Sequence, residues 1–137
     1  MPQQRSLFLT LLWLCPFTLA TGAVAEPAGT RPERILGDPV AGQRKFIVCR
    51  SCHSISSAGP NVTGPNLFGV YGRKAGTAPG YAYSRALKQT GIVWTDATLD
   101  RWIKSPKVMV AGTKEHFSGL SNPNDRADIV AFLKGAR

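Results

Sequence analysis

Five consecutive residues carry side chains whose types and spacing could do chemistry. The sequence Cys49-Arg50-Ser51-Cys52-His53 places two thiols three positions apart and an imidazole directly after the second thiol. This C-x-x-C-H pattern is the one at which haem is attached covalently. Each thiol can add to one haem vinyl group to form a thioether, and the imidazole can then bind the iron from the proximal side. The motif therefore predicts one haem c, attached through Cys49 and Cys52 and ligated by His53.

Other interpretations of the cysteine pair are weaker. A thioredoxin-like redox pair would need a βαβ pattern around it, and the surrounding sequence has none. Half of a zinc site would need further ligands, but there is no second cysteine pair and His116 is the only other histidine. A simple disulfide leaves the adjoining His53 without a role.

The N-terminal residues have the pattern of a secretory signal peptide. Arg5 precedes an apolar run at residues 7–20, and the small residues at 23–25 form a cleavage site before Glu26. The run is interrupted by Pro16 and is shorter than the roughly 20 residues that span a bilayer. We expect residues 1–25 to be removed, leaving a single domain at 26–137 in the periplasm without stable membrane insertion.

Charge and composition suggest a basic domain with many loops. The chain has 137 residues, with 17 Lys and Arg against 8 Asp and Glu, and it contains 14 Gly and 10 Pro. Such a charge could attract nucleic acid, but export and the absence of a nucleic-acid-binding motif argue against that partner. The positive charge instead predicts steering toward acidic protein surfaces.

Helices separated by loops must position the haem motif. We expect a first helix capped by Asp38 that runs into the motif, a short helix over 83–89, a helix capped by Thr95 and ended by Pro106, and a last helix capped by Asn122. The last helix has an apolar stripe at i, i+3 and i+4. Residues 54–80 and 111–121 are expected to be loops. The sequence therefore predicts an all-α domain whose small core is completed by a flat apolar group.

The order and spacing of the motifs resemble class I cytochromes c, and within them the mitochondrial-like soluble subgroup. The segments that carry this resemblance are GDPVAGQRKFIVCRSCHSI, TGPNLFGVYGRKAG, APGYAYSRAL, GIVWTDATLDRWIKSPK, AGTKEHFSGL and DRADIVAFLK. The resemblance implies the cytochrome c fold, in which three main helices and long loops wrap around one covalently bound haem and the first and last helices cross. It also implies that Pro65 accepts a hydrogen bond from the proximal imidazole, and that Arg73, Tyr83 and Trp94 hold a haem propionate.

The pattern departs from the family at the distal ligand. The family has an axial methionine in a P-G-T-K-M-x-F segment, whereas this chain has AGTKEHF, with Glu115 at the methionine position. Imidazole binds haem iron well, so His116 is the favoured distal ligand. The alternatives are an open or water-bound site with Glu115 binding the iron or the water, Lys114 or Lys107, and Met109.

Two classes of function follow from this sequence. The resemblance implies a monomeric electron carrier, not an enzyme, that moves single electrons between acidic redox partners such as a dehydrogenase, an oxidase or a membrane complex. The altered distal segment leaves an alternative, a ligand-binding haem protein that acts as a gas binder, a sensor or a weak peroxidase. That function needs an open sixth coordination position.

Overall fold

The structure, a computed structural model, describes residues 35–137; the expected signal peptide at 1–25 and its cleavage site lie outside the described residues. Within the described residues the chain forms helices and loops without a named β-strand, which confirms the all-α expectation. The helices are α1 (Pro39–Lys45), α2 (Ile47–Arg50), α3 (Arg85–Gln89), α4 (Asp96–Lys104), α5 (Pro106–Met109) and α6 (Pro123–Gly135). None of them is long and apolar enough to cross a membrane.

Local sequence sets where the three longest helices begin. The Asp38 side chain accepts a hydrogen bond from the backbone of Val40, and Asn122 caps α6 in the same way. Thr95 and Thr98 form a reciprocal capping box at the start of α4. Each cap satisfies backbone N–H groups that have no partner within the helix.

Two predicted helices have different bounds from those expected. The helix expected at 83–89 begins only at Arg85, because the Ser84 hydroxyl accepts a hydrogen bond from the Leu87 N–H and so acts as the N-cap. Pro106 ends α4 as predicted, but it also begins α5, where its missing N–H is tolerated at the first helical position.

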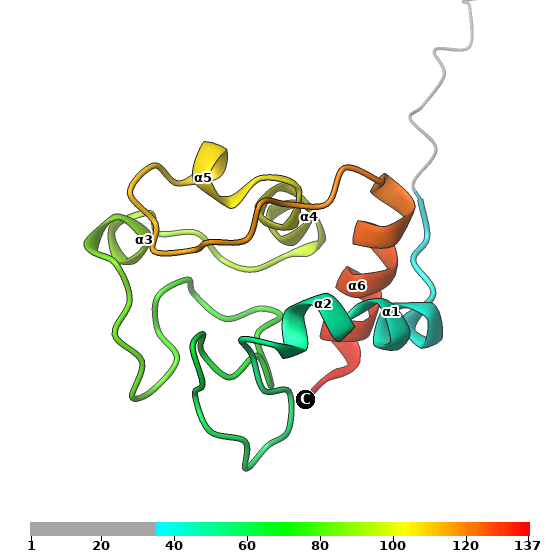
Figure 1. The fold of residues 1–137 in the computed structure, drawn as a ribbon, viewed down its shortest axis with the longest axis horizontal. Coiled ribbons are helices and arrows are strands. Elements are labelled where there is room, and N and C mark those ends of the chain that lie inside the picture. The colour runs from blue at the N-terminus through cyan, green and yellow to red at the C-terminus, as the bar shows by residue number, and fades with distance from the viewer. Residues whose placement is uncertain (1–34) are drawn as a thin grey trace, which may run out of the picture. The chain divides into compact units, whose positions relative to one another are not determined.

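Helices α1 and α6 cross in direct contact (Figure 1). The contact is close because Gly42 has no side chain: a Cβ there would lie 2.0 Å from the Asp128 carbonyl oxygen. The rings of Phe46 and Phe132 pack beside this crossing with centroids 5.2 Å apart. The Lys45 ammonium adds two hydrogen-bonded ion pairs to α6, at 2.6 Å to Asp125 and 2.5 Å to Asp128.

Side-chain hydrogen bonds hold the long loop that follows the cysteine motif. The Asn66 side-chain amide donates to the backbone carbonyls of Ser56 and Gly59, and the Asn61 side-chain Oδ1 accepts from the Asn66 backbone N–H. The Arg73 guanidinium donates to two further backbone carbonyls of the same loop. These bonds replace regular secondary structure, so the loop has a fixed path although it forms no helix.

Candidate functional site

The candidate site is a cavity between the cysteine motif, the loops and the helices α4 and α6. Its volume is about 380 Å³. Its walls are mostly apolar and come from segments far apart in the chain, including Phe46, Leu67, Val70, Leu87, Leu99, Ile103, Ile129 and Leu133. A cavity with such walls accepts a large apolar group.

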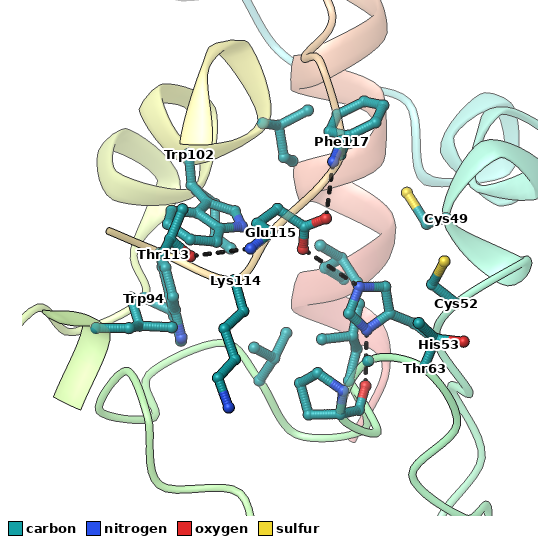
Figure 2. A pocket seen from close by; sticks show the side chains of 18 of the residues that line it. Cys49, Cys52, His53, Thr63, Trp94, Trp102, Thr113, Lys114, Glu115 and Phe117 are labelled. Atoms are coloured by element: carbon teal, nitrogen blue, oxygen red, sulfur yellow. Dashed lines mark hydrogen bonds and ion pairs between the residues drawn. The ribbon is translucent and has the colours of Figure 1, made fainter. Parts of the chain in front are cut away.

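The two cysteines lie together on one side of this cavity. Cys49 is in α2 and Cys52 is in the turn that follows, where the N–H groups of Cys52 and His53 both donate to the Cys49 carbonyl. Both thiols are free and partly buried, and both cysteines line the same cavity as His53 (Figure 2). The pKa of Cys49 is raised to about 11, mainly by burial and to a smaller extent by the nearby charges of Glu115 and Cys52.

In the His53 imidazole, Nδ1 is hydrogen-bonded to the protein and Nε2 is available to bind a metal. Its Nδ1 lies 2.8 Å from the Pro65 carbonyl oxygen, so Nδ1–H donates this bond in the neutral ring. The Nε2 lone pair then points away from Pro65 and into the cavity (Figure 2). Gly64 lies against the ring, since a Cβ there would be 2.3 Å from His53 Cε1. The ring is therefore fixed in both tautomer and orientation, as a metal-binding histidine requires.

The three residues expected to hold a propionate all line the same cavity. The Arg73 guanidinium donates at 3.1 Å to the carbonyls of both Asn66 and Phe68, which fixes its position. The Trp94 backbone N–H donates to the Arg73 carbonyl, and the indole is 7% exposed. Burial raises the pKa of Tyr83, so its hydroxyl stays protonated and can donate. The structure therefore brings these donors together, while their propionate role stays a prediction.

Glu115 faces His53 across the cavity. Its Oε2 lies 3.9 Å from His53 Nε2, and its Oε1 accepts a hydrogen bond from the Phe117 N–H at 3.0 Å. The Glu115 N–H donates to the Thr113 hydroxyl at 3.2 Å. Figure 2 shows Glu115 between these contacts and His53, with the Trp102 indole beside it.

The other residues considered as distal ligands are either exposed or outside the cavity lining. His116 lines the cavity but is exposed, and its role stays a prediction. Lys114 is also exposed, and its ammonium donates to the Ala82 carbonyl at 3.2 Å. Lys107 and Met109 are not among the residues that line the cavity.

Sequence reasoning did not assign site roles to several lining residues. Trp102 lines the cavity and packs against Trp94 with ring centroids 5.4 Å apart. Thr113 and Phe117 contact the cavity through the same segment as Glu115. Their position in the sequence could have identified Thr113 and Phe117, because they lie two residues before and after Glu115, which occupies the methionine position of the resembled family.

The donor set fits a haem attached to the protein. Two thiols and one imidazole lie at the wall of a cavity that is otherwise apolar, and polar donors from Arg73 and Trp94 line it as well. Thioether attachment uses the thiols, iron ligation uses the imidazole, and the apolar walls accept a porphyrin ring.

Comparisons with known proteins agree with this geometry. Residues 39–137 match the family model described as cytochrome c. The chain is 47% identical over 97 residues to cytochrome c2 of Rhodomicrobium vannielii, covering 71% of this chain and 78% of that protein. It is 47% identical over 115 residues to cytochrome c of Theileria annulata, covering 83% of this chain and 96% of that protein. The solved structure of cytochrome cH from Methylobacterium extorquens is similar, with 46% identity, a TM-score of 0.69, and coverage of 72% of this chain and 99% of that chain.

Proposed function

Because this chain belongs to the cytochrome c family, whose members carry covalently attached haem c, we propose that it is a monomeric periplasmic electron carrier of the mitochondrial-like soluble subgroup. Relatives in this family are electron carriers and not enzymes. We assign haem attachment to Cys49 and Cys52 and proximal ligation to His53. The bound haem supplies one-electron chemistry through its iron.

The observation that carries this proposal is the joint position of the thiols and the imidazole. Cys49, Cys52 and His53 line one cavity, and His53 Nε2 is left free because Nδ1 is bound to the Pro65 carbonyl. That bond increases the basicity of the ligating nitrogen and prevents rotation of the ring. The apolar walls exclude water, which keeps the reorganisation of the surroundings small when the charge of the site changes.

The donors of Arg73, Tyr83 and Trp94 support a second assignment. A haem propionate buried at this cavity would need charged or polar partners, since an unpaired buried carboxylate is costly. The Arg73 guanidinium is already fixed by two carbonyls and can offer its remaining N–H groups without further ordering. We therefore propose that these three residues hold one propionate.

Surface charge supports a partner of opposite sign. Five basic side chains on or near the segments that line the cavity are exposed, and none forms an ion pair with a described carboxylate: Arg50, Lys74, Arg85, Lys107 and Lys114. Such charges increase the rate of encounter with acidic redox proteins and keep the contact short-lived. The rate of electron transfer to an acidic partner is expected to fall as ionic strength rises.

The test is expression of the full chain with haem-attachment machinery, followed by intact mass under denaturing conditions. The expected mass is that of residues 26–137 plus one haem, and a redox titration should show a single one-electron transition. Replacing both Cys49 and Cys52 by alanine should abolish the covalent haem. A secreted wild-type chain without covalently retained haem would refute the proposal.

One observation favours the alternative function, a ligand-binding haem protein. Among the described residues that line the cavity there is no methionine, so the strong thioether ligand of the family is missing from the distal side. Carbon monoxide added to the reduced protein separates the two functions. Slow or absent binding indicates a carrier with a firmly held distal ligand, whereas fast stoichiometric binding indicates a site that admits small molecules.

A further inference from the structure

The distal segment at residues 111–120 points one carboxylate at the proximal histidine. We propose that Glu115, bound through Oε2, is the distal ligand of the haem iron in this protein, so that the iron has one imidazole and one carboxylate ligand. This inference rests on the proposed covalent haem and deepens it, because it assigns the ligand that the sequence left open between several side chains.

The distance between the two facing atoms carries the argument. Glu115 Oε2 and His53 Nε2 are 3.9 Å apart. Protein nitrogen and oxygen ligands lie about 2 Å from a metal such as zinc, so two such ligands on opposite sides of one metal ion are about 4 Å apart. The observed separation is therefore the one expected for a pair of axial ligands.

The chemistry of the two atoms agrees with the distance. With Nδ1–H donating to Pro65, the neutral His53 ring presents a lone pair at Nε2. A carboxylate oxygen is also an acceptor, and 3.9 Å is too long for a hydrogen bond. When the ring is neutral and the carboxylate is ionised, two electron-pair donors therefore face each other. A metal cation between them satisfies both.

Hydrogen bonds within the segment also orient the Glu115 carboxylate toward His53. Its Oε1 is fixed by the Phe117 N–H, and its own N–H is bound to the Thr113 hydroxyl. Only Oε2 is left facing His53. Ligating carboxylates are commonly hydrogen-bonded through their other oxygen, which orients them toward the metal.

The backbone path of residues 113–117 disfavours Lys114 and His116 as iron ligands. Residues 113, 115 and 117 are partly buried, while 114 and 116 are exposed, as expected for extended chain in which successive side chains point in opposite directions. Turning His116 inward would turn Glu115 outward and break its bonds to Thr113 and Phe117. The Lys114 ammonium is engaged with the Ala82 carbonyl outside this position.

An axial carboxylate has two measurable consequences. It is an anionic oxygen ligand, so it stabilises ferric over ferrous iron and lowers the reduction potential relative to a thioether. It is also a weaker-field ligand than imidazole, so the ferric iron should be high-spin. A second histidine ligand would instead give low-spin ferric iron.

The experiment compares the purified ferric holoproteins of wild type, Glu115→Gln, Glu115→Met and His116→Ala by absorption, electron paramagnetic resonance and redox titration. Glutamine is the matched control, because its carbonyl oxygen can still accept from the Phe117 N–H while the ligating carboxylate is lost. We expect a high-spin wild type, an unchanged His116→Ala, and an altered spectrum for Glu115→Gln. Glu115→Met should be low-spin, with the methionine–iron charge-transfer band and a raised potential.

Three results would overturn the assignment. Wild type and Glu115→Gln could share one ferric spectrum, or a low-spin wild type could become high-spin in His116→Ala. A wild-type resonance that broadens in water enriched in the magnetic isotope of oxygen would show that water, not Glu115, binds the iron. All of these measurements are made on protein that retains haem, whereas failure to retain it would refute the proposed function itself.

Discussion

Replacing Gly42 by alanine should push α1 and α6 apart. The added Cβ would lie 2.0 Å from the Asp128 carbonyl oxygen and 2.8 Å from the Phe132 Cβ. Close carbon–oxygen contacts in proteins are about 3.3 Å or longer, so the helices must separate by roughly 1.3 Å. The obstacle is backbone and cannot move aside as a flexible side chain would.

The cost follows from two opposing effects. Forcing one extra carbon into a packed contact costs about 1–3 kcal/mol, and we take the upper end because the Phe46–Phe132 ring contact beside the crossing is disturbed as well. Alanine returns about 1 kcal/mol because it favours the helix over glycine. The net loss in the free energy of unfolding is therefore about 2 kcal/mol.

The assay is guanidinium unfolding of the holoprotein, followed by tryptophan fluorescence. Gly135→Ala is the matched control, because Gly135 is also helical but a Cβ there meets no other atom within 4 Å. Because it gains the helix preference of alanine without a clash, the control should be as stable as wild type or up to about 1 kcal/mol more stable. If Gly42→Ala proved as stable as Gly135→Ala, the close crossing of α1 and α6 would not be the contact that stabilises this fold.

Three further predictions concern other contacts. Gly64→Ala places a Cβ 2.3 Å from His53 Cε1, so it should turn the proximal ring and lower the yield of haem-loaded protein, measured as haem absorbance per milligram. The hydrogen bond from Lys45 holds the pKa of Asp128 below its ordinary value, so its contribution to stability is present above about pH 4 and is lost as the pH falls through the lowered pKa. Asp128→Asn should therefore be less stable than wild type at neutral pH, and denaturant titrations in acid should show the difference closing. Arg126→Met removes a buried guanidinium that bonds a carboxylate and two carbonyls, and chemical denaturation should show a loss of about 3 kcal/mol.

The parts of the fold that depend on local chemistry could be predicted from the sequence. Asp38, Thr95 and Asn122 begin their helices as expected, because a cap acts on backbone N–H groups only two or three residues away. The spacing of Cys49, Cys52 and His53 likewise predicts that they lie together, since one turn of chain sets their geometry, and all three line one cavity.

The orientation of the side chains in residues 111–120 could not be predicted from local sequence. Ligand preference favoured His116, and its role stays a prediction. Which side chains of residues 111–120 face His53 depends on where the segment is anchored. The Leu120 N–H donates to the Ile103 carbonyl, and Gly119 lies so close to α4 that a Cβ would be 2.1 Å from the Lys104 carbonyl oxygen. Its φ of 104° is one that side-chain-bearing residues rarely adopt. These contacts span distant residues, and no periodic pattern in the sequence reports them.

The two sides of the cavity are stabilised by different interactions. On the proximal side, the α1–α6 crossing and the Pro65 bond fix the cysteine motif and His53. On the distal side, no described backbone N–H between residues 114 and 119 donates to a backbone carbonyl, and side chains hold the segment instead. A carboxylate at position 115 adds a strong acceptor for the Phe117 N–H that a thioether does not offer, because sulfur accepts hydrogen bonds only weakly. If Glu115 binds the iron as we propose, one side chain would supply both the distal ligand and the hydrogen bond that positions it, and neither would require a change on the proximal side.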